Sequence, residues 1–234
     1  MKQMHGISTR QIREAILIFA FALAPMAASA TTAPRAAVEV HHYREVTGDS
    51  VKEVTWQLQR GDALVLTYSS PTERHVTTTG RAYNTLRWKV VDSASDTDLI
   101  ATRKENTITI EGRFKGQTVE KSLEIDACPW FQATSLPLRD LIASSDNERS
   151  FWTIRLDTLS VHKLKATKKE VQEIESGGTW KQVQRVRLRP DGFLAPFWKS
   201  DYWFTLPENV FYRFEGPSGP PGSPMTIVTF QDRS

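Results

Sequence analysis

The sequence predicts an all-β fold: a strongly curved antiparallel meander or half-open barrel with one short helix near residues 135–144. Two observations predict it. From about residue 38 the apolar side chains recur with a period of two, which is the spacing of a strand and not of a helix. The breaks between these runs are short and rich in Gly, Asp, Ser and Asn, which favours tight turns between antiparallel neighbours.

About fourteen runs have strand character. Eight of them lie before the predicted helix: 38–46, 51–59, 63–70, 74–80, 86–92, 98–105, 107–114 and 118–126. Six follow it: 151–157, 161–174, 180–190, 201–206, 210–216 and 225–231. A flat open sheet curls or splits beyond about ten strands, so we expect one strongly curved sheet or two packed sheets.

The segment TSLPLRDLIASSD carries the helix signal. Ser135 precedes it as a cap and Pro137 fits the first turn. Three apolar side chains then recur at i, i+3 and i+4: Leu138, Leu141 and Ile142. We expect this helix to plug or cover the open face of the curved sheet, because strands such as 107–114 have one apolar and one polar face.

Residues 1–30 have the three parts of a secretory signal peptide. A basic start is followed by the apolar run AILIFAFALA, and Ala28 and Ala30 provide the A-x-A spacing of a cleavage site. Ten apolar residues are too few to cross a bilayer, which takes about 20. We therefore expect removal of residues 1–30 and a periplasmic or secreted single β-rich domain over 31–234. That mature chain has no predicted transmembrane segment, and its Pro/Gly-rich loop at 216–224 is exposed.

The charge balance and the cysteine content limit which classes of function the chain can have. The signal holds three of the 30 Lys/Arg and one of the 27 Asp/Glu, so the mature formal charge is +1. Nearly balanced, interspersed charge gives no support for nucleic-acid binding. The single cysteine, Cys128, cannot form an internal disulfide. We expect Cys128 to be a buried, unreactive thiol; the alternatives are that it forms an intermolecular disulfide or acts as a nucleophile.

Residues 192–216 hold nine of the 23 aromatic side chains. Alternation places Tyr202 and Phe204 on one face of their strand and Trp203 on the other, and it predicts a hairpin whose aromatic rings meet across the PEN turn. Such a block is either packed core or the lining of an apolar ligand site. The candidate lining residues are Trp198, Tyr202, Trp203, Phe204, Phe211 and Tyr212, with Trp130 and Trp152 as weaker candidates.

The sequence contains few other candidates for binding or catalytic residues. Arg185, Arg187 and Arg189 alternate on one face and are candidates for an anionic group such as a lipid head group; the alternative is a solvated face paired with glutamates. His41 and His42 are adjacent in a strand, so their rings point to opposite faces and cannot share a metal from one side. No metal site, cofactor or catalytic residue is predicted.

A resemblance adds to these observations. The order of WQLQRGD, FWTIRLD, WKQVQRVRL and FYRFEG behind a signal peptide resembles a loosely defined group of exported bacterial proteins of unknown function. In fold these are similar to the lipoprotein-carrier half-barrels (LolA- and LolB-like), in which helices close a curved antiparallel sheet around an apolar cavity. The resemblance implies no catalytic residue.

Together these patterns predict a non-catalytic protein that binds an apolar or amphipathic ligand, lipid or lipoprotein-like, at the cell envelope. Two alternatives stay open. One is a scaffold or assembly partner of another envelope protein, and the other is a hydrolase of an envelope polymer.

Overall fold

The computed structural model describes residues 38–176, 178–191, 198–219 and 222–231. The predicted signal peptide lies outside these residues. The described part forms one antiparallel sheet of fourteen strands and one α-helix, α1 (Ser135–Ala143), which confirms the predicted fold class. The strands before the helix are β1 (Val38–Thr47), β2 (Ser50–Arg60), β3 (Leu64–Ser69), β4 (Glu73–Thr79), β5 (Thr85–Asp92), β6 (Thr97–Lys104), β7 (Thr107–Phe114) and β8 (Gln117–Glu124). Those after it are β9 (Glu148–Arg155), β10 (Ser160–Ser176), β11 (Thr179–Pro190), β12 (Ser200–Thr205), β13 (Phe211–Pro217) and β14 (Met225–Gln231).

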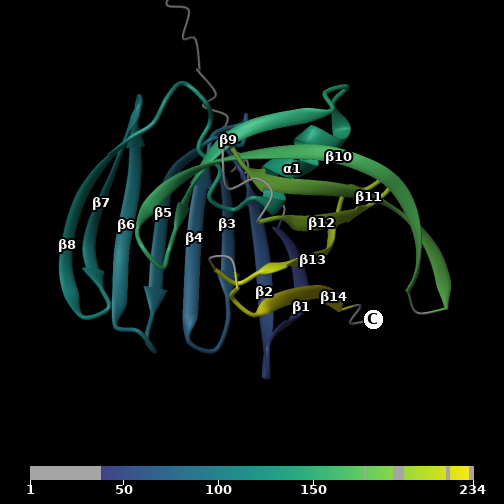
Figure 1. Cartoon of the computed structure of the whole chain (residues 1–234), viewed down its shortest axis with the longest axis horizontal. Coiled ribbons are helices and arrows are strands. Elements are labelled where there is room, and N and C mark those ends of the chain that lie inside the picture. The colour runs from purple at the N-terminus through teal and green to yellow at the C-terminus, as the bar shows by residue number, and fades with distance from the viewer. Residues whose placement is uncertain (1–37, 177, 192–197, 220–221, 232–234) are drawn as a thin grey trace, which may run out of the picture. The chain divides into compact units, whose positions relative to one another are not determined.

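Two meanders join in the middle of this sheet. Their order is β8-β7-β6-β5-β4-β3-β2-β1-β14-β13-β12-β11-β10-β9, so β8 and β9 are the two edges. The join is the antiparallel pairing of β1 with β14, in which Tyr43 lies opposite Phe230. In Figure 1 the strands β2–β8 run up and down the view and β10–β12 run across it, so the sheet turns strongly along its length.

The segment that follows β8 connects strand β5 of the first meander with the edge strand β9 of the second. The Thr85 amide donates to the Trp130 carbonyl at 2.8 Å, and the Phe131 amide donates to the Trp152 carbonyl at 2.8 Å. Trp130 and Trp152 also form an isolated parallel bridge. Trp130 and Phe131 therefore connect the two meanders through backbone hydrogen bonds, while β8 and β9 stay the unpaired edges of an open sheet.

Helix α1 plugs the concave side, as the sequence predicts. Leu138 and Leu141 are fully buried in a cluster that contains side chains from both meanders. The remaining buried members of this cluster are Tyr43, Val54, Phe131, Phe151, Leu164, Ala166, Val186, Leu188, Phe204, Phe211 and Val228. Arg139 Nη2 lies 2.7 Å from Glu39 Oε1, so an ion pair also ties the helix to β1.

The predicted helix cap is wrong by one residue. Thr134 is the N-cap, whereas Ser135 is the first helical residue and is buried. The hydroxyl of Thr134 makes no capping hydrogen bond, because it pairs instead with the Tyr202 hydroxyl at 2.8 Å. A tertiary contact has replaced the local one.

The other end of the sheet has its own core. Trp88, Ile108, Ile110 and Trp130 are almost fully buried there together with other apolar side chains of β5–β7, the 125–130 segment and the β9–β10 turn. Large side chains therefore fill the concave side at this end.

His75 lies in a row of rings on the concave side. Its ring centroid is 5.2 Å from that of Tyr68 and 5.7 Å from that of Trp88. Its Nε2 atom is buried without a hydrogen-bond partner among the described residues. Burial lowers the pKa of His75; Lys52 lowers it further, while Glu73 and Asp92 act in the opposite direction.

A loss of stability on acidification follows. Since the folded-state pKa of His75 is depressed, the unfolded chain binds more protons below the ordinary histidine pKa of about 6.5. Unfolding free energy should therefore fall as the pH drops through that value. We expect His75→Phe to reduce this fall when urea midpoints are compared between about pH 7.5 and about pH 5.5. An identical pH dependence of the variant and the wild type would contradict the assignment.

Candidate functional site

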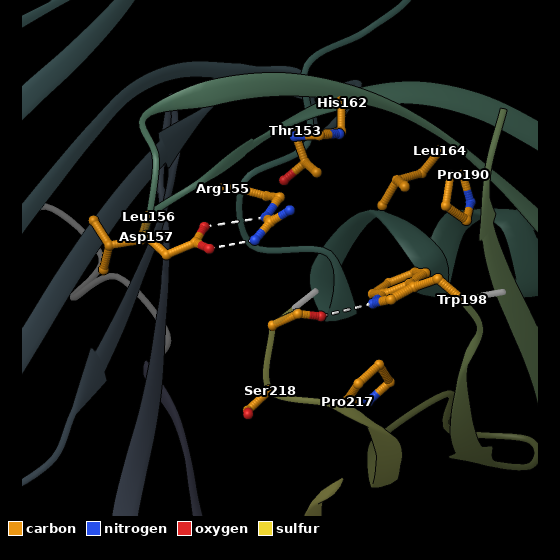
Figure 2. Close-up of a pocket in the computed structure, with 11 residues that line it drawn as sticks. Thr153, Arg155, Leu156, Asp157, His162, Leu164, Pro190, Trp198, Pro217 and Ser218 are labelled. Atoms are coloured by element: carbon orange, nitrogen blue, oxygen red, sulfur yellow. Dashed lines mark hydrogen bonds and ion pairs between the residues drawn. The ribbon is translucent and has the colours of Figure 1, made fainter. Parts of the chain in front are cut away.

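A cavity of about 280 Å³ opens where β9, β10 and β11 meet the segment after β13. Figure 2 shows the residues that line it. They are Thr153, Arg155, Leu156, Asp157, His162, Leu164, Pro190, Trp198, Pro217, Ser218 and Gly219.

Strand alternation explains half of this lining. Thr153 and Arg155 are two residues apart in β9, so their side chains share a face. His162 in β10 lies directly opposite Thr153, and Leu164 lies opposite Pro190 of β11. The neighbouring strands thus bring these five side chains to one side of the sheet.

The apolar wall is made by Leu164, Pro190, Pro217 and Trp198. The Trp198 indole nitrogen donates to the Gly219 carbonyl at 3.1 Å, and this bond is drawn in Figure 2. The bond holds the ring across the cavity and satisfies its one polar atom, so the ring presents apolar surface.

The polar wall lies opposite Trp198 in Figure 2 and centres on Arg155. Its Nε donates to Asp157 Oδ1 at 3.0 Å, and its Nη2 contacts the other carboxylate oxygen. His162 Nε2 is 3.0 Å from the Ser160 hydroxyl. Burial, and then the positive charge of Arg155, lower the pKa of His162, while Asp157 acts in the opposite direction; the net effect favours the neutral imidazole. The cavity therefore combines an apolar wall with one compensated charge pair.

Of the predicted lining residues, Trp198 alone reaches this cavity. Phe204 and Phe211 are core, at 0% and 2% exposure. Tyr202 packs against both rings, and burial raises the pKa of its hydroxyl to about 12. Trp130 is fully buried, with its indole nitrogen bonded to Gln132 Oε1.

The remaining aromatic candidates lie elsewhere. Trp203 donates its indole N–H to Gln172 Oε1 at 2.9 Å, and the Tyr212 ring lies 6.4 Å from that of Phe230, tilted by 36°. Trp152 donates to Asp126 Oδ1 at 2.7 Å. The structure thus divides the predicted set among the core, the cavity and other half-buried positions instead of bringing it together.

The basic stripe is largely compensated. Arg185 pairs with Glu170, and Arg187 makes two bonds of 2.9 and 3.0 Å to Asp201. Arg189 is exposed and has no ion pair with the described residues. The arrangement matches the solvated face paired with acidic neighbours.

Ten of the eleven lining residues were not among the sequence candidates, and Pro217, Ser218 and Gly219 fell only within the predicted Pro/Gly-rich loop at 216–224. The one local signal was the run FWTIRLD, in which Thr153, Arg155 and Asp157 share a face. Nothing local connects it to Trp198 or to Pro217.

Two further observations concern the described residues. They contain no group of three His, Cys, Asp or Glu that could hold a metal ion. The described part also contains no helix with the length and apolar character needed to cross a bilayer.

No family model matches the chain, and no curated protein matches it in sequence. Among solved structures it is similar to the crystal structure of a β-barrel-like protein of the domain of unknown function DUF1849 from Brucella abortus. The TM-score is 0.57 at 6% sequence identity, over 85% of this chain and 99% of that one. The likeness shows a β-barrel-like fold of unknown function, while a specific similarity to LolA- and LolB-like carriers stays a prediction.

Proposed function

We propose that the mature chain is a non-catalytic periplasmic protein that binds an apolar or amphipathic ligand in the Trp198 cavity. The observation that carries the proposal is the cavity itself: an apolar wall closed by Trp198 faces a few polar groups, which is the usual composition of a small-molecule site. The predicted signal peptide and the resemblance to lipoprotein carriers support the compartment and the ligand class.

The charges of the polar wall indicate which polar head group the proposed ligand carries. Asp157 already compensates Arg155, so a multiply charged anion would leave uncompensated charge in a partly enclosed site. Thr153 and neutral His162 offer additional hydrogen-bonding groups. A neutral hydroxyl or amide therefore fits this wall best, and a single carboxylate adds one negative charge that the N–H donors of Arg155 can share with that of Asp157.

The volume of the cavity indicates the size of the apolar part of the proposed ligand. A cavity of about 280 Å³ lies just below the range of about 300–1,000 Å³ typical of small-molecule sites. One acyl chain or a compact apolar molecule suits this space, and a lipid with several chains would place one of them here.

Titration with decanoate tests the proposal. We expect calorimetry to show one site in the mature wild type, and about tenfold weaker binding in Trp198→Ala because an apolar wall is lost. Ser218→Trp, made at an exposed position on the rim, should block the cavity without disturbing the core.

Leu86→Ala is the matched control, since Leu86 is an exposed apolar residue of β5 outside the cavity. Its affinity should stay within about twofold of the wild type, as is usual for surface substitutions. Equal weakening by all three variants, or no binding by the wild type, would count against the cavity as the site.

Among the alternatives, a hydrolase is not favoured by this cavity, because Asp157 is its one carboxylate and is bound to Arg155. The assembly-partner alternative is favoured by a different feature, the long hairpin formed by β10 and β11.

A further inference from the structure

The hairpin of β10 and β11 extends beyond both of its neighbours. Pairing of β10 with β9 ends at Thr167, and pairing of β11 with β12 begins at Val183. Beyond these points residues 169–176 and 179–182 form a two-stranded arm, which Figure 1 shows curving away from β12. On the side of β12, Trp180 and Lys181 have no partner strand among the described residues.

Aromatic side chains line two hollows under this arm. One, of about 460 Å³, includes Trp180, Val210, Tyr212 and Phe230. The other, of about 430 Å³, includes Trp180, Tyr212 and Trp203. The two hollows share Trp180 and Tyr212 and therefore adjoin; together they are here called the arm groove. Trp180 is 70% exposed, which is unusual for so large an apolar side chain.

The charges of the arm groove are unbalanced. Its acidic side chains are Glu173, Glu175, Glu208 and Glu215, and its basic ones are Lys181 and Arg213. Arg213 is bound to Glu215. Glu173, Glu175 and Glu208 are exposed and form no ion pair with the described residues. The groove therefore offers carboxylates beside open aromatic faces.

We propose that the arm groove binds an extended, lysine- or arginine-bearing segment of another polypeptide. Cationic side chains are attracted both to aromatic faces and to unpaired carboxylates. An extended segment can reach both hollows, and it can hydrogen-bond to the unpaired side of β11 at Trp180 and Lys181 as an added strand. A small amine would fill one hollow and leave the other empty. A neutral glycan would use the rings and leave the carboxylates unpaired.

The test uses the mature protein and a synthetic probe. The probe is a capped octapeptide of alternating lysine and alanine with one central phenylalanine, titrated at low ionic strength. Its counterpart has glutamate in place of lysine. We expect the lysine peptide to bind, the glutamate peptide not to bind, and the affinity to fall with added salt because the charges are exposed.

Two variants locate the site. Trp180→Ala should weaken binding about tenfold, as for an interface tryptophan. Glu173→Gln combined with Glu175→Gln should weaken it about fivefold. The matched control is Glu111→Gln with Glu120→Gln, an exposed carboxylate pair facing each other on β7 and β8, and it should stay within about twofold. Urea unfolding of each variant verifies that it is folded.

Three results would overturn the proposal. The first is equal binding of the lysine and glutamate peptides. The second is binding of a chitin hexasaccharide, lost in Trp180→Ala, by a protein that does not bind the lysine peptide. The third is a dimer of this chain, detected by light scattering, that Trp180→Ala dissociates, because a second copy would then be the occupant. None of these outcomes depends on the Trp198 cavity.

Discussion

Gly112→Ala should destabilise the protein by about 3–5 kcal/mol, which is among the largest effects of a single methyl group. A Cβ atom at Gly112 would lie 2.3 Å from the Asp98 carbonyl oxygen and 2.9 Å from the Leu99 Cα. Both contacts are with backbone of the paired strand β6, which cannot rotate away. The φ angle of +128° is also one that L-residues rarely adopt.

Gly80→Ala is the matched control, because a Cβ atom there would meet nothing within 4 Å. We expect it to stay within about 1 kcal/mol of the wild type. Urea unfolding monitored by circular dichroism measures both variants. If Gly112→Ala were as stable as Gly80→Ala, the close approach of β6 and β7 described above would be incorrect.

Phe204→Ala should cost about 3–5 kcal/mol, since it removes a fully buried ring from the main core. Phe204 lies 5.8 Å from Phe211 and 6.4 Å from Tyr202, measured between ring centroids, so the resulting cavity cannot collapse easily. Trp180→Ala, from the exposed arm, should change the unfolding free energy by less than about 0.5 kcal/mol.

This pair of variants separates the two roles that an aromatic residue can have in this chain. A small cost for Phe204→Ala, below about 1 kcal/mol, would mean that the ring is not tightly packed. A large cost for Trp180→Ala would mean that the arm is part of the core and that the arm groove is closed. Thermal unfolding of the same samples provides an independent measure.

The local sequence pattern was sufficient to predict the positions of the strands and the helix. Period-two runs and short turns identify the fourteen strands to within a few residues, because side-chain alternation is a local property. The helix position also follows from its local apolar spacing. The pairing of β1 with β14 joins Tyr43 to Phe230 across most of the chain, and no local signal encodes it.

The candidate site was less predictable for a related reason. Strict alternation predicts that Phe211 lies on the opposite face of its strand from Tyr212 and Phe214. A bulge between Trp203 and Phe204 shifts the register, however, and places Phe204 opposite Phe211. That shift buries Phe211 in the core, and Tyr212 is turned toward Phe230. The cavity itself depends on tertiary contacts between β9–β11 and residues 217–219, so only Trp198 could be named from the sequence.

The central claim is that the Trp198 cavity holds an apolar ligand, and native mass spectrometry tests it most directly. Mature wild type and Trp198→Ala would be purified gently from the same expression host, measured under native conditions, and then denatured and extracted. We predict a reproducible added mass in the wild type that extraction identifies as an apolar or amphipathic molecule, and its loss in folded Trp198→Ala. A wild type with no added mass that also fails to take up decanoate would contradict the account.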